Sequence, residues 1–574
     1  MLSRVSLRQV LVWMALVVTV SGSQSISSNR APESDDARER QTRAESRDGQ
    51  IARVLQQTLE AGTASKGSPP RERQYVLFFY AARGYRPAWQ FGSARDAARV
   101  LIDRMAAADQ DGLAAADYAP SLWRERMDGV ASNASEFVSL DIDLTTALFR
   151  FASDLAFGPA PERSARGLDL VGLLATARNA HTARQVIDAL EPVHEQYRQL
   201  KRALSDYREI EARGGWPRVP EGPALKPASP RETDAGGMTK RSSTQGAAEG
   251  AMVRALCGRL AVTGDLTAAS SGAACDASPG QPAGYNAAVE AAIQRFQSRH
   301  GLVVDGIVGP GTVAAFNVPA AERVQQIVAN MHRWRRLPDK LGDVHVSVNI
   351  AGFRLVAVEG GRTVLSMRVV AGDIDSPTPI MTDEIDYLEF SPYWNVPETI
   401  TRAELLPRIA RNPSYLHHQR FEVVDGWDDS ARIVDPATID WEAAAEDFPY
   451  RLRQQPGPQN ALGLVKFMFP NTRHIYLHDT PSTNRFDEPQ RAFSHGCVRV
   501  EDPVALAAFL LRDSAWSPDT IRAAMDGEER RIVPLATPVP VHLTYFTAWV
   551  EDDVMQFRED LYGLDGADAS GSRP

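Results

Sequence analysis

The sequence predicts a multidomain α+β protein with three parts: a helical scaffold, a small three-helix domain, and a mainly-β domain with an inserted lid. Three observations support this fold class. At 574 residues the chain exceeds one ordinary domain. A hydrophobic content of 43% is enough to bury real cores. Apolar residues follow helical spacing before about residue 318 and alternate in β fashion from about residue 344.

The first 23 residues have the pattern of a signal peptide. Arg4 and Arg8 precede the apolar run Val10–Val20, and small residues follow it. That run covers only about half of the ~20 residues of a membrane-spanning helix. We therefore expect export. No A-x-A cleavage site stands out, so retention by an uncleaved N-terminal segment stays open.

Residues 24–70 are rich in Ser, Arg, Glu and Gln and predict a linker, mostly disordered outside a short helical patch at Ile51–Leu59. Residues 71–249 read as a helical scaffold domain with no visible chemistry. Within it, residues 214–250 form a loop dense in Pro, Gly and Ser. Residues 250–318 predict the compact three-helix domain, in which Pro310 sits where a helix begins.

The mainly-β domain is expected over residues 340–515. Its first strands alternate around Gly360 and Gly361, which predict a hairpin turn. A long mixed segment at about 391–460 interrupts the strands, and inserts of this length are commonly functional lids or disordered. The alternating tail, residues 516–574, is expected to pack on this domain as a C-terminal β segment.

Charge and cysteine content narrow the function classes. A net charge of −10 without a basic block argues against a nucleic-acid partner. The chain has three cysteines. Cys257 and Cys275 are the pair best placed for a disulfide in an oxidising compartment, with two unpaired thiols as the equal alternative. Cys497 is the odd thiol, and it reads either as a nucleophile or as a buried structural cysteine.

His478 is the candidate base for Cys497. A thiol pKa of about 8.5 must fall by about 1.5 units, roughly 2 kcal/mol, before thiolate dominates at pH 7. One imidazolium at ~4 Å supplies about 4 kcal/mol before desolvation at an effective dielectric of 20. His495 is the rival base. We assign it a supporting role because adjacent residues of an extended segment point to opposite faces.

The residues around Cys497 suggest the rest of the site. Gly496 allows close approach, and the N–H groups of Gly496 and Cys497 can face a developing oxyanion. Ser494 is a candidate for holding an imidazole, and Arg499 for binding a substrate carboxylate, with an ordinary surface ion pair as the alternative for Arg499. No zinc-ligand spacing occurs here, so neither a metal nor a cofactor is expected.

The motif "HDTP…RAFSHGCVRV" closely resembles the signature of L,D-transpeptidases with the YkuD-type fold. "SPYWNVPETI" and "PVPVHLTYFTAWVEDD" are similar to the large multidomain murein enzymes of Gram-negative bacteria. "YNAAVEAAIQRFQSRHGLVVDGIVGPGTVAAFN" resembles the peptidoglycan-binding domain, and "YAARGYRPAW" the family's N-terminal scaffold. Smaller family members often have Asn at the position of Arg499, whereas the large murein group has Arg.

The resemblance implies a reaction. Cys497 attacks the diaminopimelate carbonyl of a tetrapeptide stem, D-Ala leaves, and a second stem's amine resolves the thioester to a 3–3 cross-link. It implies His478 as the base and the N–H groups of His495, Gly496 and Cys497 as the oxyanion hole. It also implies carbapenem acylation of Cys497 and a lid over the substrate.

Trp394, Tyr450 and Asn460 are candidate substrate contacts in or beside the lid, with packing as the alternative for each. The implied partners are peptidoglycan stem peptides and glycan, with other cell-wall synthases as further candidates, and the implied location is the periplasm. The sequence does not fix the oligomeric state. It also leaves open whether the acceptor serves cross-linking, D-amino acid exchange or protein anchoring.

Two other functions compete. One is a Cys/His cell-wall endopeptidase or carboxypeptidase, although those folds usually place Cys before His. The other is a wall-binding protein with a dead site.

Overall fold

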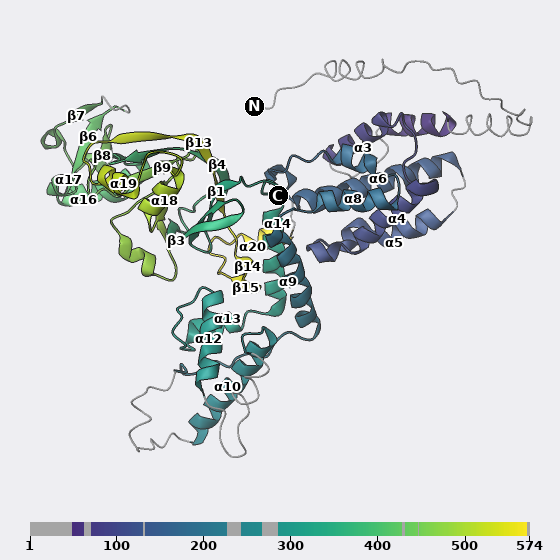
Figure 1. Ribbon diagram of the computed structural model, residues 1–574, viewed down its shortest axis with the longest axis horizontal. Helices are drawn as coiled ribbons and strands as arrows, with labels where there is room; N and C mark the ends of the chain where they lie inside the picture. The colour runs from purple at the N-terminus through teal and green to yellow at the C-terminus, as the bar shows by residue number, and fades with distance from the viewer. Residues whose placement is uncertain are drawn as a thin grey trace, which may run out of the picture.

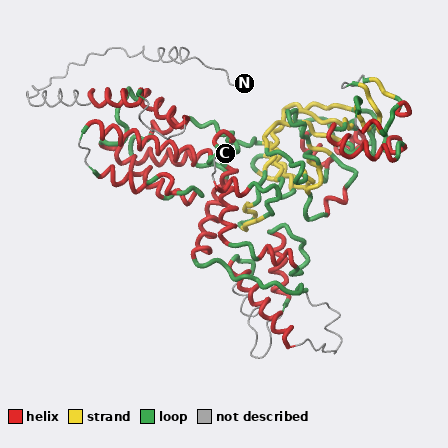
Figure 2. Tube along the Cα trace, turned by 180° about the vertical axis from the view of Figure 1, so that it is seen from behind, coloured by secondary structure: helices red, strands yellow, loops and turns green. Residues whose placement is uncertain are grey.

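The computed structural model describes residues 49–61, 70–129, 133–226, 243–266, 285–426, 431–445 and 447–570. Three arms leave a central junction (Figure 1). Two arms are helical and the third holds most of the strands (Figure 2), so the predicted multidomain α+β class is confirmed. The predicted signal peptide lies outside the described residues. Within the described ranges, no helix has both the length and the apolar character needed to span a bilayer.

The scaffold arm is a helical domain around one large core. Its helices are α3 (Pro70–Ala82), α4 (Gly92–Ala106), α5 (Pro120–Asp128), α6 (Ala134–Phe157), α7 (Leu170–Thr176) and α8 (Ala180–Leu190), with short turns η1 (Ala108–Asp111), η2 (Ala115–Tyr118) and η3 (Pro161–Arg163). The helical patch expected inside the linker is helix 49–60. Its Ile51, Leu55 and Leu59 are buried in the scaffold core, so this part of the presumed linker belongs to the domain.

The second arm has its own small core, formed by α10 (Ser243–Val262), α12 (Ala287–Arg299) and α13 (Pro310–Phe316). Cys257 is buried in that core and is disulfide-bonded, which favours the first of the two cysteine alternatives. Cys275 lies outside the described residues. The Pro/Gly/Ser-rich loop is attached here, because Leu225 pairs with Val308 in an isolated bridge.

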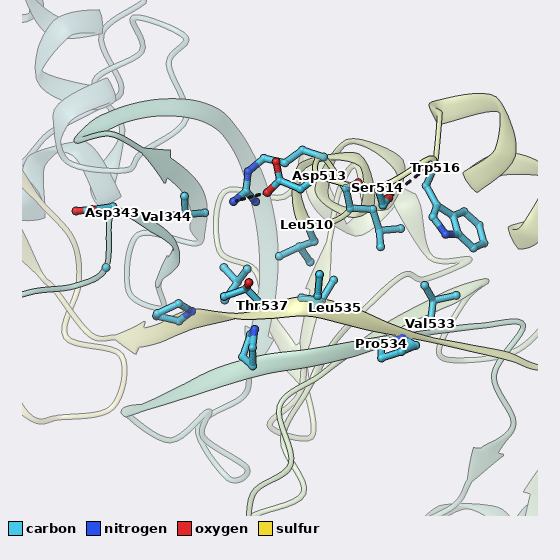
Figure 3. A pocket seen from close by; sticks show the side chains of 17 residues that line it. Asp343, Val344, Leu510, Asp513, Ser514, Trp516, Val533, Pro534, Leu535 and Thr537 are labelled. Carbon is cyan, nitrogen blue, oxygen red and sulfur yellow. Dashed lines mark hydrogen bonds and ion pairs between the residues drawn. The ribbon is translucent and has the colours of Figure 1, made fainter.

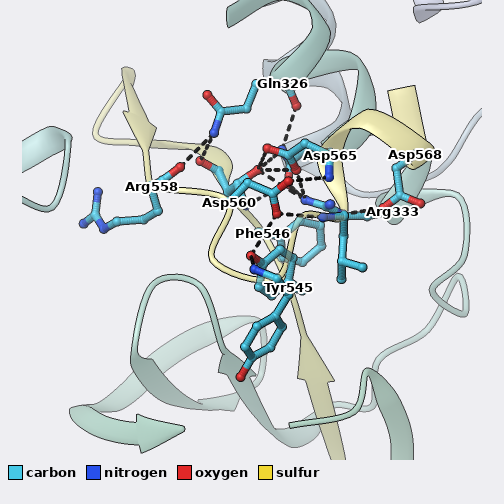
Figure 4. Close-up of polar contacts among 12 residues, drawn as sticks. Gln326, Arg333, Tyr545, Phe546, Arg558, Asp560, Asp565 and Asp568 are labelled. Carbon is cyan, nitrogen blue, oxygen red and sulfur yellow. Dashed lines mark hydrogen bonds and ion pairs between the residues drawn. The ribbon is translucent and has the colours of Figure 1, made fainter. Parts of the chain in front are cut away.

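The junction joins the three arms. It consists of α9 (Glu195–Ala212), α14 (Ala320–Trp334), the hairpin β14 (Ala548–Glu551)–β15 (Val554–Phe557) and α20 (Asp565–Ser570). Arg333 of α14 forms ion pairs with Asp565 at 2.7 Å and Asp568 at 2.8 Å (Figure 4). The Asn330 side-chain amide donates to the Thr547 hydroxyl at 2.8 Å. α14 therefore holds the C-terminal tail by buried polar contacts as well as by packing.

The third arm is a nine-stranded sheet, with strand order β11-β3-β12-β10-β9-β4-β13-β1-β2. The strands are β1 (Val344–Asn349), β2 (Arg354–Glu359), β3 (Arg362–Gly372), β4 (Met381–Phe390), β9 (Val465–Met468), β10 (Leu477–His478), β11 (Ala492–Ser494), β12 (Val498–Val500) and β13 (Arg531–Thr544). Because β2 also pairs with β3, the sheet closes on itself. Helices α18 (Pro503–Leu510) and α19 (Pro518–Met525) contribute apolar side chains to the core.

The C-terminal segment differs from its expected place. It was expected to pack on the sheet domain, but β13 is an interior strand, antiparallel to β4 and parallel to β1. Its inward side chains, Val539, Val541 and Leu543, are buried, which is why this strand belongs inside the sheet. The hairpin β14–β15 that follows packs instead against α9 and α14.

The insert at 391–460 folds as a unit with its own hydrophobic core. Its four-stranded sheet is β5 (Trp394–Asn395), β8 (Arg451–Gln454), β6 (Phe421–Asp425) and β7 (Arg432–Val434). Its helical elements are α15 (Glu398–Ile400), the π-helical turn η4 (Thr401–Leu405), α16 (Leu406–Arg411), α17 (Ser414–His418), η5 (Pro436–Thr438) and η6 (Ala443–Ala445). We call this unit the lid.

Candidate active site

The sheet brings the two ends of the signature together. β10 ends at His478, and β12 begins directly after Cys497. The two strands are parallel neighbours, with His478 opposite Arg499. All three side chains line one cavity of about 370 Å³ between the sheet and the lid. A spacing of 19 residues in sequence (497 − 478) thus becomes one site because β10 and β12 are hydrogen-bonded side by side.

The turn before Cys497 requires glycine. Gly496 has φ +108°, a conformation that L side chains rarely adopt. Its carbonyl accepts a hydrogen bond from the Thr378 hydroxyl at 2.8 Å. The Ser494 hydroxyl donates to the carbonyl of Cys497 and accepts the Gly496 N–H at 3.2 Å. Ser494 therefore holds the turn, which differs from its expected role of holding an imidazole.

These bonds decide which N–H groups are available. The Gly496 N–H is already engaged by Ser494, so it is not free to face an oxyanion in this state. Among the described residues, the N–H groups of His495 and Cys497 donate no backbone hydrogen bond. The two N–H groups that remain available are therefore those of His495 and Cys497.

His478 is buried and has one defined tautomer. Its Nδ1 lies 2.5 Å from the carbonyl oxygen of Asp479. A carbonyl only accepts, so Nδ1 carries the proton and Nε2 keeps its lone pair. Burial and then the charge of Arg499 lower the pKa of His478 to about 3, outweighing the carbonyls of Asp479 and Leu462. At neutral pH this side chain is an uncharged imidazole, which suits a general base.

Cys497 is also uncharged at rest. Burial raises the pKa of its thiol, although hydrogen bonds from Tyr476 and the charges of Lys466 and Arg499 act in the opposite direction. From the sequence we expect a thiolate stabilised by an imidazolium at His478. The structure gives the opposite pair, a thiol and a neutral imidazole, because desolvation by the packed surroundings acts against both charges.

His495 points to the lid. Its Nε2 lies 2.6 Å from a carboxylate oxygen of Glu404 in the π-helical turn η4. Both side chains line the cavity, and His495 is half-exposed. This contact joins His495 to the lid, and His478 stays the candidate base. π-Helical turns occur often at functional sites.

Arg499 offers an uncompensated charge. Its side chain lines the cavity, and its Nε is buried without a hydrogen-bond partner in the described part of the chain. Among the described residues, no carboxylate lies within ion-pairing distance of Arg499, and the charge of Arg485 acts against its own. The guanidinium is thus available to a carboxylate of a ligand.

The three candidate substrate contacts in or beside the lid have different surroundings in the structure. Trp394 lines the cavity. Tyr450 packs on the lid core, with its ring 5.9 Å from that of Phe448. Asn460 is buried, and its amide donates to the carbonyls of Pro392 at 2.9 Å and Gln455 at 3.0 Å. Trp394 therefore stays a candidate substrate contact, whereas Tyr450 and Asn460 make packing and hydrogen-bond contacts within the protein.

Two residues that contact the site, Tyr476 and Glu404, were not predicted from the sequence. Tyr476 hydrogen-bonds the Cys497 thiol, and its ring lies 5.7 Å from that of His478. Its position two residues before His478, directly before β10, was an available signal, because alternate residues of an extended segment share a face. Glu404 gave no such signal, since it meets His495 only through the folding of the lid.

Two alternative functional sites, a metal site and a second cavity, are less well supported by the structure. In the described ranges, no group of three or more His, Cys, Asp or Glu side chains is arranged to hold a metal. A second cavity of about 550 Å³ lies beside β13 (Figure 3). Its lining is largely apolar, with Leu510, Trp516 and Leu535, and includes neither cysteine nor histidine. The thiol cavity is therefore the candidate active site.

Comparison with known proteins agrees with this geometry. Three family models match: "L,D-transpeptidase catalytic domain" over residues 343–541, "Scaffold domain" over 74–204, and "Putative peptidoglycan binding domain" over 278–316. A curated protein of Haemophilus influenzae, named "Putative L,D-transpeptidase", is 35% identical over 241 residues. That match covers 42% of this chain and 48% of the relative, so the chain spans about half of the relative's length.

Two solved structures are more distant. One, titled "Structure of the Ldtfm-avibactam carbamoyl enzyme", is 13% identical and covers 36% of this chain and 50% of its own, with a TM-score of 0.17. The other is an L,D-transpeptidase fragment from Xylanimonas cellulosilytica, 16% identical, covering 51% of this chain and 92% of its own, also with a TM-score of 0.17. The family assignment rests on the domain matches and the curated relative: the chain carries an L,D-transpeptidase catalytic domain of the YkuD type, together with a scaffold domain and a peptidoglycan-binding domain.

Proposed function

We propose that this protein is a peptidoglycan L,D-transpeptidase that makes 3–3 cross-links. The observation that carries the proposal is the thiol cavity, which combines the Cys497 thiol, a neutral imidazole at His478 and an unpaired guanidinium at Arg499. A nucleophile, a base and a carboxylate receptor are what acyl transfer from a peptide ending in a free carboxylate requires. The domain match over residues 343–541 supports the same class.

In the first half-reaction the thiol of Cys497 attacks the diaminopimelate carbonyl of a tetrapeptide stem. His478 Nε2 takes the thiol proton as the sulfur–carbon bond forms. The N–H groups of His495 and Cys497 stabilise the oxyanion. The carbon–nitrogen bond to D-Ala then breaks, the proton passes from His478 to the leaving amine, and a thioester remains. Arg499 binds a carboxylate of the donor stem.

In the second half-reaction the side-chain amine of another diaminopimelate attacks the thioester. His478 accepts the amine proton and returns it to the departing sulfur, which restores the thiol. The lid holds the acyl-enzyme between its own face and the sheet. It thereby limits entry of water, which would turn transfer into hydrolysis.

Product analysis tests the proposal. The purified full chain, incubated with disaccharide-tetrapeptides, is expected to release D-Ala and to form cross-linked dimers, both followed by mass spectrometry. Cys497→Ala should abolish both products and still bind sacculi. Release of D-Ala without dimers would replace the proposal with a carboxypeptidase. Undiminished turnover in Cys497→Ala would overturn the nucleophile assignment.

A covalent probe gives an independent readout. Carbapenems are expected to acylate Cys497, adding the mass of one inhibitor to the intact protein. Cys497→Ala is the matched control and should remain unmodified. Absence of an adduct on the unaltered chain, under conditions where it turns over stems, would contradict the proposed access to the thiol.

We further propose that the protein works in the periplasm, where its substrate lies, and that residues 1–23 direct its export. Their charged and apolar pattern supports this. Fractionation of Gram-negative cells that express the full chain, or a form lacking residues 1–23, is the test. Only the full chain should be recovered outside the cytoplasm.

A further inference from the structure

A third cavity lies where the peptidoglycan-binding domain meets the rest of the chain. Its volume is about 730 Å³, within the range that holds small ligands. We call it the junction cavity. Its walls come from α13 and the loop after α12, from α14, from the tail that follows β15, and from Gln490 of the catalytic domain. No single domain forms it.

Two guanidinium groups in its lining have no acidic partner. Arg323 is only 7% exposed, and its Nε is buried without a hydrogen-bond partner. Arg558 donates to the carbonyls of Arg299 at 3.0 Å and Phe557 at 2.8 Å. Among the described residues, neither arginine has a carboxylate within ion-pairing distance. A buried guanidinium without a counter-charge is costly, and a ligand carboxylate would remove that cost.

The acidic side chains near these arginines are committed elsewhere or are exposed. Asp565 pairs with Arg333, and Asp560 accepts the Tyr545 hydroxyl at 2.9 Å (Figure 4). Glu322 and Glu559 are exposed. Four carboxylates thus line the cavity beside the two arginines, and three of them, Asp565, Asp560 and Glu559, already bond Arg333, Tyr545 and Gln490. This pattern suits a peptide that carries carboxylates and a free amine.

The junction cavity depends on close contact between domains. Gly301, at the end of α12, has φ +68°, and a Cβ there would lie 2.5 Å from the Cδ of Arg558. The side chain of Arg558 therefore packs directly on this glycine. The next residue, Glu559, accepts a hydrogen bond from the Gln490 side chain at 2.6 Å. The segment Arg558–Glu559 thus contacts both the binding domain and the catalytic domain.

Gln490, which lines the junction cavity, is close to Cys497 along the chain. Gln490 precedes Cys497 by seven residues (497 − 490 = 7), so their Cα atoms lie at most about 25 Å apart. One peptidoglycan strand, or two stems already linked to it, spans that distance. An occupant of the junction cavity and an occupant of the thiol cavity can therefore belong to the same polymer.

We propose that the junction cavity is a second peptidoglycan site, which binds an acidic stem peptide through Arg323 and Arg558 and keeps the strand beside the thiol. The proposal rests on the proposed function for the nature of the polymer. It goes beyond that function by assigning recognition to residues outside the binding domain itself.

Equilibrium binding to purified sacculi tests this proposal. All variants are made in the full chain with Cys497→Ala, so that turnover does not consume the sites. Arg323→Gln and Arg558→Gln are each expected to weaken binding by at least about tenfold, the value of one lost charge-assisted hydrogen bond. The Lys variants should recover part of the loss. Arg254→Gln, at an exposed position of α10, is the matched control and should bind unchanged.

If an arginine variant does not fold, a variant that fills the cavity and keeps both arginines still tests the proposal. Ala314 is an exposed α13 residue in the cavity lining, so Ala314→Trp keeps both arginines and occupies the space. It should also lose at least about tenfold in affinity. Thermal unfolding identifies variants that are merely unstable. Normal sacculus binding by a folded Ala314→Trp or Arg323→Gln protein would overturn the proposal.

Soluble probes define the ligand. A stem tetrapeptide should compete with sacculi for the unaltered cavity, and a glycan disaccharide without peptide should not. Competition by the disaccharide alone would overturn the assignment to the peptide. If the unaltered chain neither binds sacculi nor turns over stems, the proposed function itself fails. If it does both and the variants behave identically, only the second site fails.

Discussion

The rate at which iodoacetamide alkylates Cys497, followed over a range of pH, tests whether the resting site holds a thiol beside a neutral imidazole. The pKa of His478 falls from its ordinary value of about 6.5 to about 3. A shift of about 3.5 units makes charging this imidazole roughly 5 kcal/mol less favourable. Attraction to a thiolate at ~4 Å returns about 4 kcal/mol at an effective dielectric of 20. Burial also raises the pKa of the thiol, so the neutral pair is favoured.

The two protonation states give different pH profiles. Only thiolate reacts, so a neutral pair should show a rate that rises about tenfold per pH unit between about pH 6 and 8. A thiolate–imidazolium pair would show a plateau over the same range. Labelling is measured on the intact protein by mass, with Cys497→Ala to subtract modification elsewhere. A rate that changes less than about threefold over those two units would refute the reasoning.

Three further predictions follow from contacts around the site. Glu404→Ala removes the half-exposed contact with His495, worth about 0.5–1 kcal/mol, so amide exchange in the π-helical turn should accelerate about two- to fivefold by mass spectrometry. Glu442→Ala, at an exposed position of the lid, should not do so. Asn460→Ala leaves buried carbonyls unpaired and should destabilise the catalytic domain by about 2–4 kcal/mol in denaturant titrations, with carbapenem labelling of the folded protein unchanged. Arg499→Gln removes a charge that lowers the pKa of His478, so that pKa should rise. The KM for the donor stem should also rise, by about tenfold or more, because a carboxylate receptor is lost. An unaltered KM would show that Arg499 does not bind the substrate.

Much of the catalytic domain could be predicted from the sequence because its signals are local. The change from helical to alternating spacing near residue 344 identified where the β domain starts. The motif around Cys497 identified the nucleophile candidate, and positive φ at Gly496 agrees with the glycine found there. Strand pairing then explains why a residue 19 positions upstream reaches the same cavity.

The features of the site that could not be predicted depend on burial and on contacts between residues distant in sequence. The protonation of the thiol and imidazole could not be predicted because desolvation is set by the packed surroundings, and it exceeds the pairwise attraction. The contact between His495 and Glu404 joins residues 91 apart (495 − 404), which no periodicity encodes. The junction cavity could not be predicted from the sequence for the same reason, because its walls come from several separate stretches of chain.

The interior position of β13 has a consequence for the order of folding. The strand that separates β4 from β1 is made of residues 531–544, which follow the other eight strands of this sheet in the chain. Until β13 is added, β4 and β1 each lack a neighbouring strand. The sheet that holds β10 and β12 is then not closed. The scaffold and binding domains are complete well before that point. The thiol site is therefore completed after the cores of the scaffold and binding domains, whose residues all precede β13 in the chain.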